Sequence, residues 1–316
     1  MNPIAATIVD VNAPVRLFFE PRDRYFVLYL LPQLLFAVWF VRRKRDRRPP
    51  IGRDAVRHRS TRHDVLLLVT NAALVAPLIA IVFQSGRIVR PMRDGIEAVT
   101  GRHSLLSGWQ ARVFITVALA MAADFGFFVA HALQHRVPAL WQFHRVHHSA
   151  PILTPLTNGR EHPVADVFQA LFVTLTLTVT AAVSLALVTP GVRVVSIEGT
   201  NVVILGSFVA LANLRHSGTW ISFGRRIEHV ISSPAQHQIH HSIDPRHFDR
   251  NFGVMFSLWD WLFGTLYTTE THEQLHFGLP NQSNYEWTAA SLYLAPLAGI
   301  VRRRQSDTFA LERASA

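Results

Sequence analysis

The feature that most constrains this 316-residue chain is a pair of histidine-rich stretches. The first covers residues 131–148 and places five histidines within eighteen residues, and the second, HxxHH at 237–241, lies about ninety residues further on. Residues three or four apart share a face of a helix, so each stretch would present its imidazoles on one side. A single histidine is more often a surface or hydrogen-bonded core residue. HxxxH together with two HxxHH patterns instead favours a metal site, because neutral imidazole is the commonest metal ligand in proteins.

Eight histidines make up these patterns, and the chain has no cysteine to share the task. Disulfides, zinc fingers and thiolate-bound clusters are therefore excluded, and any metal must be held by His, Asp, Glu or backbone oxygen. A catalytic zinc ion usually takes three protein ligands, so eight imidazoles predict two metal ions. Imidazole suits iron, copper, nickel or zinc, and iron with open coordination positions can activate O2. The candidate ligands are His131, His135, His144, His147, His148, His237, His240 and His241.

The composition is that of a membrane protein rather than of an ordinary soluble domain. Hydrophobic residues make up 49% of the chain and charged residues only 16%, whereas about a quarter of a typical soluble domain is charged. The net charge of +10 could suggest a nucleic-acid partner. Its densest part, however, is the run 42–48, which directly follows an apolar segment and is better explained as a topology signal. We therefore expect a lipid bilayer, and no nucleic acid, as the partner.

Several apolar segments are long enough to cross a bilayer, which takes about 20 residues. They are residues 25–41, 65–83, 113–130, 164–189 and 194–214. The last two would form a membrane hairpin, although Glu198 and Asn201 interrupt its second arm. Two further stretches, 244–267 and 287–301, mix aromatic or apolar residues with charges and are expected to lie at the membrane interface. The sequence thus predicts an all-α fold, a multi-pass membrane helical bundle of about four to five transmembrane helices plus interfacial helices.

The basic loop at residues 42–63 fixes the expected orientation. It carries ten Lys/Arg against two acidic residues, and such short basic loops stay in the cytoplasm. An even number of crossings then brings the histidines to the same side, as a cytoplasmic histidine-rich metal-binding cap on an integral protein of the bacterial inner membrane. The predicted organisation has three parts: an N-terminal membrane region (1–112), a catalytic domain (113–270), and a C-terminal interfacial helix and tail (271–316).

Asp124 is the one carboxylate inside the segment that ends at His131. It lies seven residues before His131, which places both side chains on one face of a helix, two turns apart. An intramembrane carboxylate is energetically costly and usually functional. We expect Asp124 to serve the catalytic site by orienting an imidazole N–H. The alternative is a carboxylate that faces a water-filled crevice.

The motifs in residues 124–267 closely resemble the fatty acid hydroxylase superfamily, also called the sterol desaturase family. The resemblance rests on six elements in the family's order, which are HALQH (131–135), HRVHHS (144–149), REHP (160–163), LRHSG (214–218), SPAQHQIHHS (233–242) and DPRHFDRNFGVMFSLWDWLFGTLY (244–267). The resemblance implies a di-iron centre, two iron ions held by the eight histidines above. His162 and His216 match additional family histidines and are further candidate ligands, whereas His229 and His247 are not expected to bind metal.

The same resemblance implies the reaction. Its members use O2 and two electrons to oxidise an unactivated C–H bond of a membrane lipid, such as a fatty acyl chain or a sterol. Nothing in the chain resembles the cytochrome b5 domain that some members carry, so an external electron donor, a separate electron-transfer protein or reductant, is expected. Hydroxylation and desaturation both remain open, as does the lipid.

Two other functions fit a histidine-rich membrane protein. A transition-metal transporter or metal-binding protein would place its ligands near the bilayer midplane, whereas these histidines follow the ends of predicted spans. A membrane zinc hydrolase would need a glutamate base, and the HExxH motif that supplies it is absent from the sequence. The transporter remains the alternative to the oxygenase.

Overall fold

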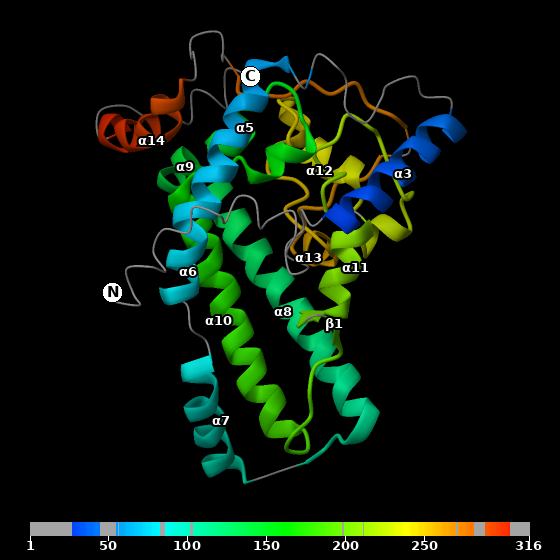
Figure 1. Ribbon diagram of the computed structural model, residues 1–316, viewed down its shortest axis with the longest axis vertical. Coiled ribbons are helices and arrows are strands. Elements are labelled where there is room, and N and C mark those ends of the chain that lie inside the picture. The colour runs from blue at the N-terminus through cyan, green and yellow to red at the C-terminus, as the bar shows by residue number, and fades with distance from the viewer. Residues whose placement is uncertain are drawn as a thin grey trace.

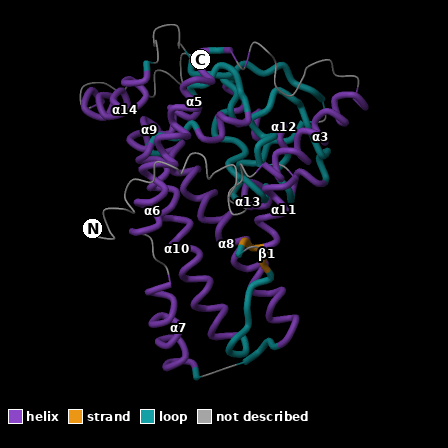
Figure 2. The backbone as a smooth tube through the Cα atoms, viewed as in Figure 1, coloured by secondary structure: helices purple, strands orange, loops and turns teal. Residues whose placement is uncertain are grey.

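The computed structural model describes most of the chain, and the described part is mainly helical (Figures 1 and 2). The described residues are 27–44, 55, 57–82, 86–101, 104–197, 199–210, 212–269, 271–280 and 288–303. The helices are α3 (Val27–Lys44), α5 (Arg59–Thr70), the π-helix η1 (Asn71–Val75), α6 (Ala76–Val82), α7 (Gly86–Thr100), α8 (Gly108–Arg136), α9 (Pro138–His148), α10 (Pro163–Leu187), α11 (Val202–Ala210), α12 (Pro234–His240), α13 (Leu258–Leu262) and α14 (Ala289–Arg303). Short 3-10 helices are η2 (Pro155–Gly159), η3 (Ile227–His229) and η4 (Pro245–His247).

Helices α8 and α10 form the long axis of the molecule and lie side by side (Figure 1). They approach closely at Gly126, where a Cβ atom would come within 2.8 Å of Val173 Cα on α10. The outward face of α10 is apolar and exposed, with Leu175 56% exposed, as expected of a surface that faces lipid. Among the described residues, three helical stretches are long and apolar enough to cross a bilayer: Arg59–Ala80, Gly108–Arg136 and Pro163–Leu187. The number of four to five spans stays a prediction.

The predicted span 194–214 is wrong as a single helix. After α10 the chain turns at Gly191, whose φ is +86°, and returns along α8 in extended form. Thr116 of α8 binds this return segment twice, accepting from Val195 N at 2.8 Å and from Asn201 Nδ2 at 2.7 Å. The strands β1 (Ser196–Ile197) and β2 (Thr200–Asn201) form a small hairpin, and only then does α11 begin. The Val195 N–H is thus bonded to α8 and not to a carbonyl within its own segment. Glu198 lies outside the described residues.

Polar residues inside the apolar segments make specific contacts between helices. In α3, Gln33 is buried, donates to Phe208 O of α11 and accepts from Asn213 N at 3.0 Å. In the span that starts at Arg59, the π-helix ends two residues before Pro77, which has no N–H to donate to the preceding turn. Residues 45–48 of the basic run lie outside the described residues.

Two helices flank this bundle. Residues 86–100, between the predicted spans 65–83 and 113–130, form the helix α7, which packs against α10. The predicted interfacial stretch near the C-terminus forms α14, whose Leu292 is fully buried against Leu67 of α5 and Val146 of α9. Figure 2 shows most of the loops gathered around α12 at one end of the molecule, while the other end is mainly helical. The histidines lie at the loop-rich end.

Candidate metal centre

The structure brings nine histidines together in two adjacent groups. All nine are buried, and within each group one ring nitrogen from every histidine lies within 4.8 Å of the others. Group one contains His131, His135, His144, His148 and His240. Group two contains His147, His216, His237 and His241. The groups are built from the C-terminal end of α8, from α9, from α12 and from the loop that follows α11.

Group two is the tighter of the two. The Nε2 atom of His216 lies 3.2 Å from Nε2 of His147, 3.1 Å from Nε2 of His241 and 3.0 Å from Nε2 of His237. Imidazole nitrogens at about 2.1 Å from one ion would be separated by about 3.0 Å at right angles and about 3.4 Å at the tetrahedral angle. The observed separations fall at this spacing, so the four Nε2 atoms fit around a single metal ion.

Group one is oriented by backbone carbonyls. His131 Nδ1 lies 2.8 Å from Phe252 O, and His240 Nδ1 lies 2.9 Å from Arg250 O. A carbonyl can only accept, so these contacts place the proton on Nδ1 and leave the Nε2 lone pair available. The Nε2 atoms of both residues are buried without a hydrogen-bond partner, as are those of His144 and His148. Buried unsatisfied nitrogens that converge are the chemistry expected of metal ligands.

The two carbonyls reach the histidines because of an unusual backbone. Asp249 and Asn251 have φ values of +57° and +56°, the left-handed region that Asp and Asn tolerate better than most residues. The Asn251 side chain fixes this turn, donating from Nδ2 to Gln236 O at 3.1 Å and accepting from Tyr267 N at 2.8 Å. The turn therefore supports His131 and His240 together.

Glu161 lies next to both groups. Its Oε1 is 3.2 Å from Nδ1 of His147, in group two, and its Oε2 is 3.7 Å from Nδ1 of His144, in group one. A carboxylate at Nδ1 orients a ligating imidazole and makes it more basic. Glu161 was not among the predicted site residues. The signal that could have found it is the carboxylate directly before His162 in the REHP motif, one of the elements of the family resemblance.

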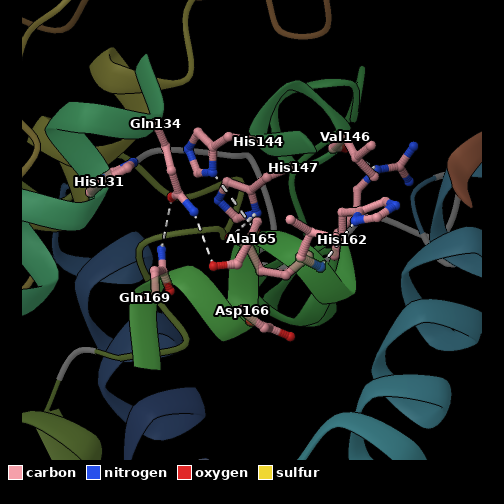
Figure 3. A network of polar contacts seen from close by, with 12 residues as sticks. His131, Gln134, His144, Val146, His147, His162, Ala165, Asp166 and Gln169 are labelled. Atoms are coloured by element: carbon pink, nitrogen blue, oxygen red, sulfur yellow. Dashed lines mark hydrogen bonds and ion pairs between the residues drawn. The ribbon is translucent and has the colours of Figure 1, made fainter. Parts of the chain in front are cut away.

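A polar network holds the α10 end of the site in place (Figure 3). Gln134 of α8 donates to Ala165 O at 3.0 Å, and Gln169 of α10 donates to Gln134 Oε1 at 3.3 Å. From the other side, Asn71 of η1 donates to Glu161 O at 2.8 Å and to Asp166 Oδ2 at 2.7 Å. Glu161, whose side chain approaches both histidine groups, is thus held in place through its backbone carbonyl.

Arg160 supports α9 from behind. It is fully buried and pairs with Asp64 of α5 at 2.9 Å. Its Nε also donates to Val146 O at 3.0 Å, and its Nη2 donates to Ser149 Oγ at 2.8 Å. A buried charge with several partners is costly to disturb. This pair fixes the turn after the HRVHH motif, and Asp64 was not predicted to have a role.

The burial of the histidines keeps them in the form that binds metal. Burial lowers the pKa of His144 and of His240 to about 3. Burial also lowers the pKa of His147 to about 4, although the Glu161 carboxylate opposes this shift. These imidazoles are therefore neutral at pH 7, and neutral imidazole is the metal-binding state.

Two of the predicted site residues are placed differently from expectation. His162 lies in neither group, because its Nδ1 caps α10 by accepting from Val164 N at 3.1 Å and its Nε2 lies 3.2 Å from Tyr293 O. Asp124 does not orient an imidazole. Its carboxylate accepts instead from Met255 N at 2.8 Å, from Phe256 N at 3.0 Å and from Trp259 Nε1 at 3.0 Å, and so attaches the 255–259 segment to α8.

The other predicted ligands all fall in the two groups, including His216, for which only the resemblance gave an indication. His229 and His247 lie in neither. His247 Nε2 is 3.1 Å from Glu273 Oε2, and His229 Nδ1 is 2.6 Å from Arg225 O.

Two cavities reach the histidines from different sides. One is lined by His135, His148 and His240, and its remaining walls are largely apolar, with Trp141 and Phe248 among them. The other also has Glu161, Asp166, Gln169 and Arg215 in its lining. Both cavities touch both groups, since the first also reaches His241. Cavities with mainly apolar walls and a few polar groups are typical of sites that bind small molecules.

Comparison with known proteins identifies the same region. The sequence model for "Fatty acid hydroxylase" matches residues 116–265, which contain all nine grouped histidines. The chain is 25% identical over 190 residues to the ornithine lipid hydroxylase OlsE of Rhizobium tropici, covering 60% of this chain and 51% of that protein. It is 27% identical over 164 residues to the Delta(7)-sterol 5(6)-desaturase erg3C of Aspergillus fumigatus, covering 50% of each.

A third relative is the alkylglycerol monooxygenase of Xenopus tropicalis, which is 24% identical over 165 residues, 52% of this chain and 32% of that protein. The chain therefore spans about half the length of the first two relatives and about a third of the third. No solved structure matches the chain. The family match covers the histidine-bearing region, so residues 116–265 of this chain are similar to the fatty acid hydroxylase family, and the relatives named above are lipid hydroxylases, monooxygenases or desaturases.

Proposed function

We propose that this chain is a membrane-bound, O2-dependent lipid oxidoreductase, a hydroxylase or desaturase that holds two iron ions in its nine grouped histidines. The observation that carries the proposal is the pair of adjacent, buried, all-imidazole groups inside a fatty acid hydroxylase domain. Iron bound in such groups supplies reductive activation of O2. The absence of cysteine from the sequence leaves imidazole as the ligand chemistry, which suits iron that cycles between oxidation states.

The surrounding residues have distinct parts in this proposal. The Phe252 and Arg250 carbonyls hold the protons of His131 and His240 on Nδ1. Glu161 fixes the rings of His144 and His147, one from each group. Because the site is buried, bulk water is excluded from the reacting atoms, which protects a strongly oxidising centre from side reactions.

The proposed substrate is a membrane lipid with an apolar chain. The cavity beside group one supports this, since Trp141, Phe248 and Leu279 line it next to His135 and His148. In hydroxylation, one oxygen atom of O2 enters the C–H bond and the other leaves as water, with two electrons and two protons consumed. We favour hydroxylation over desaturation, which requires a second hydrogen held close to the same centre. The similarity to an ornithine lipid hydroxylase and to a sterol desaturase supports lipid oxidation of either kind.

The proposed setting follows the charge pattern. We place the histidine-bearing end on the cytoplasmic side of the bacterial inner membrane, where a separate electron-transfer protein or reductant can reach it. The division into a membrane region (1–112), a catalytic domain (113–270) and a C-terminal segment (271–316) is part of the same proposal.

The experiment is to express the chain under 18O2 in a host that supplies lipid and electrons, and to analyse the lipids by mass spectrometry. A gain of one 18O atom in one lipid class supports a hydroxylase, and a loss of two hydrogens without label supports a desaturase. Elemental analysis of the purified protein should give about two iron ions per chain. His147→Ala and His240→Ala, one from each group, should lose metal and activity, whereas His276→Ala, an exposed histidine outside both groups, should keep them. An unchanged lipidome with metal bound would favour a transporter instead.

A further inference from the structure

An apolar patch outside the candidate spans themselves is exposed near the histidine-bearing end, beside α8. It is formed by Ile227, Val230 and Ile231 around η3 and by Trp261, Leu262 and Phe263 around α13, each 40–59% exposed. The two segments belong together: Ser257 Oγ donates to Glu228 O at 2.7 Å, and the His229 and Trp261 rings are in contact. Contiguous exposed apolar surface of this kind marks an interaction site rather than ordinary surface.

The patch is continuous with the surface of α8. Phe263 stacks on Phe125 and contacts Phe128, and Trp259 packs on Phe125, so α13 sits directly on the span. Asp124, which binds the segment before α13, is sixteen residues from the start of α8 at Gly108, about 24 Å along the helix. The hydrocarbon core is about 30 Å thick, so a bilayer that covers α8 from its first turn also reaches α13.

The composition of the patch and its border suits a lipid interface. Tryptophan and other aromatic side chains are enriched at the level of the lipid headgroups. Arg225 and Arg226, both exposed, directly precede Ile227 at the edge of the patch, where they can meet anionic headgroups. An apolar surface bordered by arginines is the pattern of segments that lie in the interface without crossing the membrane.

We propose that η3 and α13 form a membrane-contact patch, residues 227–231 and 261–263, which enters the lipid interface beside α8 and binds anionic headgroups through Arg225 and Arg226. The contact fixes the depth of the histidine groups relative to the bilayer. Asp260 of α13 accepts from Phe252 N at 2.8 Å and from Gly253 N at 2.7 Å, and Phe252 O in turn binds His131. Three hydrogen bonds thus link the patch to group one. The proposal does not depend on which metal or reaction the site supports.

The test uses the full chain in nanodiscs, and because the sequence contains no cysteine, single cysteines can be labelled with a nitroxide. Leu262→Cys and Ile227→Cys both report on the patch. If one of the two variants misfolds, the other still provides the measurement. Leu175→Cys, on the outward face of α10, is the lipid reference, and Arg246→Cys, whose side chain is 66% exposed, is the aqueous reference. The measurement is the ratio of collisions with O2, which concentrates in lipid, to collisions with a water-soluble nickel chelate.

The expected ratio at both patch positions matches that of Leu175→Cys and is severalfold higher than that of Arg246→Cys. A ratio equal to the aqueous reference would overturn the proposal, as would protection from both reagents, which would mean that protein covers the patch. A second arm compares phosphatidylcholine discs with discs that also contain phosphatidylglycerol. Anionic lipid should deepen the label at residue 262 in the parent chain but not after Arg225→Gln and Arg226→Gln, and an equal response would overturn the role of the arginines.

Discussion

Glu161 Oε1 lies 3.2 Å from Nδ1 of His147, on the opposite side of the ring from the Nε2 atom that faces His216. The carboxylate is thus placed to hold the ring while leaving the ligating nitrogen unobstructed. Its second oxygen approaches His144 of the other group. One side chain therefore adjoins both proposed metal sites.

Replacing Glu161 should weaken both sites together. Glu161→Ala removes the carboxylate that lies beside both Nδ1 atoms, and loss of such a neighbour of a metal ligand typically lowers metal affinity 10–100-fold. Glu161→Gln keeps one acceptor oxygen and should retain more metal. The measurement is the metal content after titration with a chelator, with Glu97→Gln on α7 as the control. Loss of only one of two ions would show that Glu161 serves a single group.

His162→Ala should leave the metal content unchanged and lower stability. Its ring caps α10, and removal of an N-cap acceptor costs about 0.5–2 kcal/mol. His162→Asn, which can also cap, should restore most of that stability. Thermal unfolding in detergent, run beside elemental analysis, measures both effects. Loss of metal from His162→Ala without a change in stability would mean that His162 is a metal ligand after all.

Asp124→Asn should destabilise the 255–259 segment while the histidines keep their metal. The carboxylate accepts three hydrogen bonds, and an amide offers one oxygen, so at least one buried donor loses its partner at a cost of about 1–3 kcal/mol. Hydrogen exchange at Met255 and Phe256 should report the loosening. The control is Asp94→Asn on the exposed face of α7. An unchanged exchange rate at Met255 and Phe256 together with a reduced metal content would instead support a role of Asp124 in orienting an imidazole.

The metal-free protein should lose stability as the pH falls below about 6.5. Burial holds the pKa of His144 and of His240 at about 3, whereas an unfolded imidazole takes up a proton near pH 6.5. Between these pH values the unfolded state binds more protons than the folded state. The free energy of unfolding therefore decreases as the pH is lowered, by up to about 1.4 kcal/mol per pH unit for each histidine. Thermal midpoints of the chelated protein from pH 8 to pH 5 measure this slope. A flat profile would mean that these imidazoles are not buried in the metal-free state.

The orientation in the membrane can be read with introduced cysteines. Val99, 88% exposed on α7, should be labelled by an impermeant thiol reagent in intact cells as Val99→Cys. Arg246→Cys, on the histidine-bearing end, should be labelled only after lysis if, as proposed, that end faces the cytoplasm. The reverse pattern would invert the proposed topology.

The histidine face of α8 could be predicted from spacing alone, but the division into groups could not. His147 and His148 are neighbours in sequence, and a helix turns about 100° per residue, so they enter different groups. Which partner each imidazole meets depends on where α12 and the loop after α11 pack. That information lies in tertiary contacts rather than in the HxxHH pattern.

The segment 194–214, predicted as the second arm of a membrane hairpin, shows which part of the fold could not be predicted from hydropathy. Hydropathy at 194–214 indicates burial but does not distinguish a helix from an extended segment whose backbone is satisfied by another helix. Here Thr116, which lies 79 residues before Val195, provides that bond. In contrast, the segments 65–83, 113–130 and 164–189 could be predicted because each satisfies its own backbone as a helix of the required length.

The uneven origin of the two groups sets an order for their assembly during synthesis. Four of the five group-one histidines come from α8 and α9, whereas three of the four group-two histidines follow residue 215. Chains emerge and fold from the N-terminus, so group one has most of its ligands while α12 is still within the ribosome. Group two has only His147 at that stage. With the proposed two ions, the first would be captured by a nascent chain and the second by the finished domain, so chains released early would carry half the metal.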